Sequence, residues 1–150
     1  MVRGRRLIDL ALEDVSEAVG ANLSFDEYRV ATFECANDVV CTLEAPDDAA
    51  RIFLHAPVLR VPGDAREKTF ARAMSLNLFQ LELAGAALAY DETSDELVLC
   101  HTTPAQDIDG DRLAATLAVF VEQVGALRRG LAPQGSDDAL QEVASYLIRA

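Results

Sequence analysis

Residues 70–101 constrain the fold of this chain more than any other stretch. Apolar residues recur there at helical spacing until Gly85 breaks the pattern. Two short runs with strand character follow, and the acidic segment at residues 91–95 separates them. We therefore predict a helix, a strand, a turn and a returning strand, which the elements on either side cover.

The helix predicted in this stretch is apolar on more than one side. Phe70, Met74 and Asn77 share one face, whereas Leu76 and Phe79 point elsewhere. A helix of that kind is buried on more than one side. In a domain this small, another subunit is the expected second cover, which is a first argument for a homodimer. Asp64 and Glu67 have the spacing of a capping box and predict where this helix begins.

The remaining elements are predicted from periodicity and turn residues. The apolar stripe of residues 5–19 indicates a helix that ends near Gly20, and the turn at residues 36–38 indicates a hairpin. Residues 51–59 form a third strand, which ends at Pro57 or lies at a sheet edge there, because proline cannot donate a ladder hydrogen bond. A long helix is capped by Asp109 or Asp111, and residues 136–150 form an extra C-terminal helix. This order predicts one α+β domain over residues 1–150 with an antiparallel sheet.

Composition excludes several classes of protein. The net charge of −12 argues against nucleic acid and anionic membranes as partners. The sequence contains no run of eighteen apolar residues, so no membrane span is predicted. Acidic residues interrupt the N-terminal segment where a signal peptide needs an apolar run. The odd number of cysteines, three, favours a reduced compartment over a disulfide framework, so we predict a cytoplasmic protein.

No catalytic or metal-binding signature is found in the sequence. His55 and His101 lie in strands, where a single histidine is usually structural. Cys35 and Cys41 lack the tight spacing and the second ligand pair of a zinc site. Cys100 and His101 are neighbours on one strand and so face opposite sides of a sheet, which prevents them from acting as a nucleophile pair. We therefore predict no enzyme activity, no metal and no cofactor.

The element order and the stretch LNLFQLELAGAALAYDETSDELVLCHTTP resemble the class I type III secretion chaperones. This family includes the chaperone of the translocated intimin receptor. The resemblance covers roughly residues 7–127 and lacks an invariant catalytic residue. It implies a chaperone that binds the N-terminal segment of a secreted effector in extended form and keeps it soluble and export-competent, without ATP hydrolysis.

The resemblance also implies two surfaces. Strand addition at a sheet edge and apolar patches would hold the effector, and the second helix with the next strand would form the homodimer. The candidate effector-binding residues are Leu7, Leu10, Val30, Thr32, Val39, Cys41, Ile52 and Leu54. The candidate dimer-interface residues are Phe70, Ala73, Met74, Leu76, Asn77, Leu78, Phe79, Ala87 and Ala89.

Alternatives remain open at this point. Alternation places only one residue set of each strand on a given face, so some of the effector-binding candidates will be core residues. Leu7 and Leu10 either contact a partner or pack on a helix from the other end of the chain. Two other functions are a protein-binding adaptor of the same fold unrelated to secretion, and a small-molecule-binding domain or enzyme that uses His101. The C-terminal helix either covers an effector patch or extends the dimer.

Overall fold

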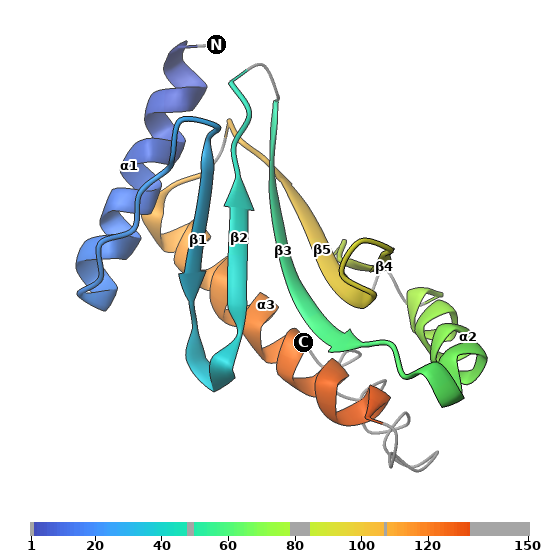
Figure 1. Cartoon of the computed structure of the whole chain (residues 1–150). Helices are drawn as coiled ribbons and strands as arrows, with labels where there is room; N and C mark the ends of the chain where they lie inside the picture. Colours follow the sequence, from blue (N-terminus) through green and yellow to red (C-terminus); the bar gives the residue numbers. More distant parts are fainter. Residues whose placement is uncertain (1, 48–49, 79–84, 107, 133–150) are drawn as a thin grey trace. The chain divides into compact units, whose positions relative to one another are not determined.

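The computed structural model describes residues 2–47, 50–78, 85–106 and 108–132. Its element order is the predicted α-β-β-β-α-β-β-α, with two short 3-10 turns, η1 and η2, before β2 and α2 (Figure 1). The predicted C-terminal helix at residues 136–150 lies outside the described residues. The elements are α1 (Val2–Val19), β1 (Val30–Glu34), η1 (Ala36–Asp38), β2 (Val40–Glu44), β3 (Arg51–Arg60), η2 (Gly63–Ala65), α2 (Arg66–Asn77), β4 (Ala87–Asp91), β5 (Glu96–Pro104) and α3 (Gly110–Leu131).

The five strands form one sheet in the order β1-β2-β3-β5-β4, as the α+β prediction requires. β1 pairs antiparallel with β2, β2 with β3, and β4 with β5. Of the two alternatives predicted for Pro57, an end of the strand there is wrong, because β3 continues through it to Arg60. The pairing of β2 with β3 covers only residues 53–55 of β3, so the missing N–H of Pro57 lies beyond that ladder. The edges of the described sheet are β1 and β4.

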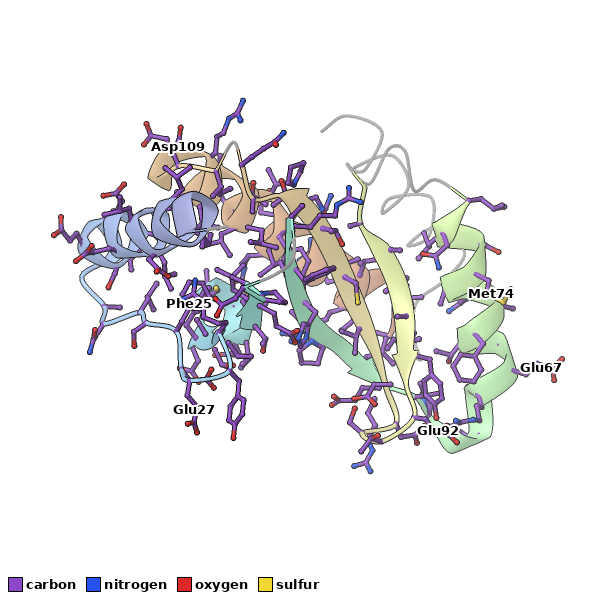
Figure 2. All side chains as sticks on the ribbon, turned by 90° about the horizontal axis from the view of Figure 1, so that it is seen from above. Phe25, Glu27, Glu67, Met74, Glu92 and Asp109 are labelled. Atoms are coloured by element: carbon purple, nitrogen blue, oxygen red, sulfur yellow. The ribbon has the colours of Figure 1, made fainter. Side chains whose placement is uncertain are left out.

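The chain divides into two compact units, which we describe separately. The first unit comprises Met1–His55 and Thr102–Val121, and the second comprises Ala56–His101 and Glu122–Ala150. In the first unit, α1 lies beside the start of α3, on the same side of the β1–β2 hairpin (Figures 1 and 2). The buried residues of this unit include Ile8, Leu12, Leu43, Leu54, Leu113 and Phe120.

Capping and turn residues set the element ends in the first unit. Gly20 ends α1 in the left-handed conformation at φ +66°. Asn37 and Asp38 turn the hairpin at φ values of 60° and 56°, which short polar residues tolerate better than most. Asp109 rather than Asp111 caps α3, since its carboxylate accepts the Arg112 N–H at 2.8 Å.

In the second unit, α2 packs against the β4–β5 hairpin, as Figures 1 and 2 show. The predicted Asp64 cap is wrong, because Asp64 lies in the 3-10 turn η2 and α2 begins after Ala65 without a side-chain cap. Leu88 on β4 and Leu97 and Leu99 on β5 are buried. This unit therefore has its own apolar core.

Candidate functional site

The outer edge of β1 is the first candidate interaction site. Cys35 donates its N–H to the C=O of Val39 at 2.7 Å, and the C=O of Arg29 accepts the Ala45 N–H at 2.9 Å. Bonded and non-bonded residue pairs alternate along an antiparallel ladder. The odd-numbered residues of this segment therefore direct their backbone groups toward β2. The even-numbered residues of β1 direct theirs outward.

Asp26 pairs with Val30, the first residue of β1 whose backbone groups point outward. Its carboxylate accepts the Val30 N–H at 2.9 Å, and its own N–H donates to the Val30 C=O, also at 2.9 Å. The same carboxylate accepts the Tyr28 N–H at 2.9 Å, which folds the preceding loop into a tight turn. In this unit the loop therefore covers the N-terminal end of the β1 edge, and Glu27 on it points away from α1 (Figure 2).

Thr32 and Glu34 carry the remaining outward groups of β1. The described residues place no hydrogen-bond partner on their outward N–H and C=O groups. We call these four groups the open edge. Unpaired groups of this kind are the template for strand addition by another chain. The Asp26 turn fixes where an added strand must stop.

The sheet face next to the open edge mixes apolar and polar side chains. Phe53 is 38% exposed and Val40 is 36% exposed. Glu44 accepts a hydrogen bond from His55, with 3.0 Å between Oε1 and Nε2. Thr32 and Thr42 are cross-strand partners whose hydroxyl oxygens lie 3.3 Å apart. This open face consists of Val30, Thr32, Glu34, Val40, Thr42, Glu44, Phe53 and His55.

The eight predicted effector-binding residues divide by burial. Leu7 and Leu10 on α1 are 37% and 46% exposed, and Val30 and Thr32 belong to the open face. The other four side chains lie in the interior of the first unit, on the face opposite Thr32, and packing there accounts for their apolar character. These four are Val39, Cys41, Ile52 and Leu54.

Arg29 ties α1 to the loops that flank β1, and no sequence motif marks it for this role. Its side chain is only 10% exposed, and its Nη1 atom lies 2.6 Å from the Asp9 carboxylate. Its Nε atom lies 3.3 Å from both Asp47 Oδ1 and the Ala45 C=O, and its guanidinium stacks on Phe25. Among the described residues, Nη2 has no hydrogen-bond partner. A single arginine between two acidic loop segments is the one signal in the sequence, and exposed loops commonly carry the same pattern.

The outer side of α2 is the second candidate interaction site. Met74 and Leu78 are 72% and 84% exposed. Figure 2 shows Met74 and Glu67 on the side of α2 that faces away from β4. Met74 lies on α2 and Leu78 is its C-cap residue, so the two exposed side chains are candidates for contact with another protein.

The other predicted interface residues have different positions in the second unit. Ala73 and Leu76 are buried against the unit's own core. Phe70 packs edge-on against Tyr90, with ring centroids 5.0 Å apart. Asn77 binds the backbone of Leu88, Ala87 is half-buried and Ala89 is exposed, whereas Phe79 lies outside the described residues.

A polar cluster joins the start of α2 to the β4–β5 hairpin. Arg66 donates to the Asp95 carboxylate at 2.8 Å and to the Tyr90 hydroxyl, and Tyr90 donates to the same carboxylate at 2.8 Å. The hydrogen bond from Arg66 holds the pKa of Asp95 below its usual range. All three groups are satisfied by one another, so the cluster fastens the hairpin and offers no reactive group.

His101 lines neither of two hollows that the described residues form. These hollows, of about 460 and 400 Å³, are lined by residues 103–116 and 64–71. Burial lowers the pKa of His101, since a half-buried imidazole is less easily charged. Within the described ranges, no cluster of three or more His, Cys, Asp or Glu side chains could hold a metal ion. No described helix has the length and apolarity to cross a membrane.

A known family accounts for this arrangement of elements. The family model of the Tir chaperone protein (CesT) family matches residues 11–128. The chain belongs to this family. The match extends from α1 to the last part of α3 and so includes both candidate sites. The resemblance predicted from the sequence is confirmed, and with it the secretion-chaperone class.

Solved structures agree with the CesT family fold. The chain matches one in the crystal structure of the ExsC–ExsE complex at 23% identity and a TM-score of 0.75, covering 85% of this chain and 96% of that one. A match in the HopA1–SchA chaperone–effector complex has 20% identity, a TM-score of 0.66 and coverages of 81% and 93%. A match in the heterodimeric ExoU–SpcU complex from the type III secretion system of Pseudomonas aeruginosa has 18% identity and a TM-score of 0.62. It covers 82% of this chain and 98% of that one. No curated protein sequence is significantly similar to this chain.

Proposed function

We propose that this protein is a type III secretion chaperone that acts as a homodimer. It binds the N-terminal segment of a secreted effector and keeps that segment soluble and export-competent. Membership of the CesT family and the similarity to chaperone–effector complexes support this function. The work needs no ATP, because masking an extended segment is a binding equilibrium.

The open edge of β1 is the observation that carries the proposal. A client segment adds there as a further strand, with its backbone bonded to Thr32 and Glu34. The Asp26 turn closes the edge at Val30, so the added strand is short and has a fixed end. Client side chains contact the open face, where Phe53 and Val40 supply apolar area. Glu34 and Glu44 on this face favour basic residues in the client.

A backbone substitution tests strand addition directly. Because the Thr32 N–H points away from β2, Thr32→Pro removes a docking donor and leaves the β1–β2 ladder intact. Thr32→Val is the matched control, since it loses the same hydroxyl contact to Thr42 but keeps the N–H. The binding partner for the assay is the N-terminal segment of each secreted effector from the same genome, co-expressed with the chaperone.

We expect wild type and Thr32→Val to retain at least one such segment, and Thr32→Pro to lose it tenfold or more. Circular dichroism checks that the proline variant is folded. Equal retention by Thr32→Pro would reject the β1 edge as the docking strand. If wild type retains no effector segment at all, the chaperone function itself is refuted.

The exposed side of α2 supports the homodimer. Met74 and Leu78 are solvent-exposed within one subunit, so charges placed there leave the subunit's own core untouched. We expect Leu78→Asp to lower the mass measured by light scattering toward that of a monomer. Val119→Asp is the control, because Val119 is 45% exposed on α3, in the other unit. A wild-type protein that is monomeric at micromolar concentration would refute the dimer.

A same-fold adaptor unrelated to secretion is the second candidate. It would use the same open edge but would bind a folded partner, and it would retain no effector segment in the co-expression test. The family match favours the chaperone. Binding of a small molecule at His101 has no comparable support from the described hollows.

A further inference from the structure

Cys35 and Cys41 lie in contact at the closed end of the β1–β2 hairpin. Their Sγ atoms are 3.5 Å apart. Phe33 is the cross-strand partner of Cys41, and Cys35 is bonded to Val39, so the two cysteines are diagonal neighbours on the inner face of the hairpin. Sulfur atoms in a disulfide are about 2.05 Å apart. A closure of about 1.5 Å, which side-chain rotation and a small backbone shift supply, would join them.

The two thiols differ in access and in acidity. Cys41 has no exposed surface, whereas Cys35 is only partly buried. The hydrogen bond with Cys41 lowers the pKa of Cys35, and partial burial opposes this effect. The thiolate is the form that reacts with oxidants. An oxidant in solution therefore meets Cys35 first, with Cys41 in contact behind it.

We propose that Cys35 and Cys41 are a peroxide-sensitive thiol pair that closes to an intramolecular disulfide. The Cys35 thiolate attacks one oxygen of hydrogen peroxide and breaks the O–O bond. This leaves Cys35 as a sulfenic acid, and the released hydroxide takes a proton to become water. Cys41 then attacks the Cys35 sulfur, the S–S bond forms, the S–O bond breaks and a second water leaves. Two thiols lose two electrons, and one peroxide is reduced to two waters.

The disulfide protects the hairpin from irreversible damage. A sulfenic acid without a neighbouring thiol oxidises further to sulfinic acid, which is polar and is not reduced by thiols. The reaction of Cys41 with the sulfenic acid prevents a sulfinic acid from forming next to Val39, which is buried in the core of the first unit. The sulfur atoms lie on the inner face and the open edge points outward from β1, so the cross-link leaves the open edge accessible. The chemistry of the pair does not depend on the proposed chaperone function.

Mass spectrometry of the full chain tests the proposal. We expect wild type treated with stoichiometric hydrogen peroxide to lose about 2 Da. The loss should lie in the part of the chain that contains Cys35 and Cys41, and dithiothreitol should restore the mass. The matched control is Cys41→Ala, which with about two equivalents of hydrogen peroxide should gain about 32 Da at Cys35 as the sulfinic acid and show no loss. Cys100 should remain a thiol in both proteins.

Three outcomes would overturn the proposal. They are oxygen uptake at Cys35 in wild type, no reaction of the pair, and a disulfide between two copies through Cys35 or Cys100. If circular dichroism shows that Cys41→Ala is unfolded, Cys35→Ala replaces it. That variant must then show no loss of 2 Da, because Cys41 has lost its partner.

Discussion

The side-chain amide of Asn77 binds both backbone groups of Leu88. Its Oδ1 accepts the Leu88 N–H at 2.8 Å, and its Nδ2 donates to the Leu88 C=O at 3.0 Å. An adjacent strand would make the same pair of bonds, so the last residue of α2 takes the place of a strand at the edge of β4. The two edges of the sheet therefore differ. β4 is occupied by its own helix at Leu88, whereas β1 is open at Thr32 and Glu34.

Replacing Asn77 by Ala should destabilise the fold and expose the β4 edge. The half-buried N–H and C=O of Leu88 lose their partners, which costs about 1–3 kcal/mol. Urea unfolding measures the change in free energy of unfolding, and light scattering measures self-association at the freed edge. Ser75→Ala is the control, because its hydroxyl bonds only the Ala71 C=O on the exposed side of the same helix. Equal stability of the two variants would contradict the role given to Asn77.

Gly110 and Gly125 on α3 should respond oppositely to alanine. A Cβ at Gly110 would lie 2.5 Å from the Cβ of Asp14 on α1, closer than real Cβ contacts come, and that atom has no freedom to move aside. A Cβ at Gly125 meets only the mobile end of Arg129 at 3.5 Å. We expect Gly110→Ala to destabilise by about 1–3 kcal/mol. Gly125→Ala should stabilise by up to about 1 kcal/mol, because alanine favours helix. Thermal unfolding of both variants measures this, and stabilisation by Gly110→Ala would refute the close approach of α1.

The sequence predicted elements better than contacts. The order of helices and strands followed from hydrophobic period and from Gly20, Asn37 and Gly85, because these signals are local. The prediction of where an element begins was wrong where two local signals competed. Asp64 has capping-box spacing to Glu67, yet η2 precedes α2 and moves the start past it. Pro57 fits inside β3 because the adjacent ladder has already ended, and ladder length is set by the tertiary pairing.

The candidate site could be predicted only in part, for a similar reason. Alternation within a strand gives two residue sets but does not say which set faces inward. Val39 and Cys41 therefore could not be separated from Val30 and Thr32 until α1 and α3 were in place. The capping of β4 by Asn77 joins residues eleven apart in sequence, and the closing of the β1 edge by Asp26 depends on how the loop before β1 folds back onto Val30. Side-chain bonds of this kind leave no period in the chain.

Arg29 should contribute more to the free energy of unfolding than an exposed arginine does. Arg29→Met keeps an apolar stem over Phe25 but removes the bonds to Asp9, Asp47 and the Ala45 C=O. We expect a loss of about 1–3 kcal/mol, because the Ala45 carbonyl loses a buried partner while both carboxylates are partly exposed and regain water. Urea unfolding measures it.

The control for Arg29 is Arg51→Met, at an exposed position of β3 in the same unit, which should change stability by less than about 0.5 kcal/mol. If the two variants behave alike, the three bonds of Arg29 contribute nothing measurable to the free energy of unfolding. If Arg29→Met is more stable than wild type, burying the Nη2 atom without a described partner costs more free energy than the other three bonds contribute.

Protonation of His101 should weaken the fold in mildly acidic solution. Burial lowers its folded pKa below the unfolded value of about 6.5, so the unfolded chain binds the proton first. The stability that the neutral imidazole contributes is complete above the unfolded pKa, and it is lost progressively as the pH falls from about 6.5 through the folded pKa. Asp95, whose pKa is also lowered, gives up its contribution in a separate window below about 3.9. Urea midpoints at several pH values between 7.5 and 5.5 therefore separate the contribution of His101 from that of Asp95. His101→Gln should flatten the decline in that range, Asp95→Asn should leave it unchanged, and an equal decline in His101→Gln and wild type would show that another group titrates there.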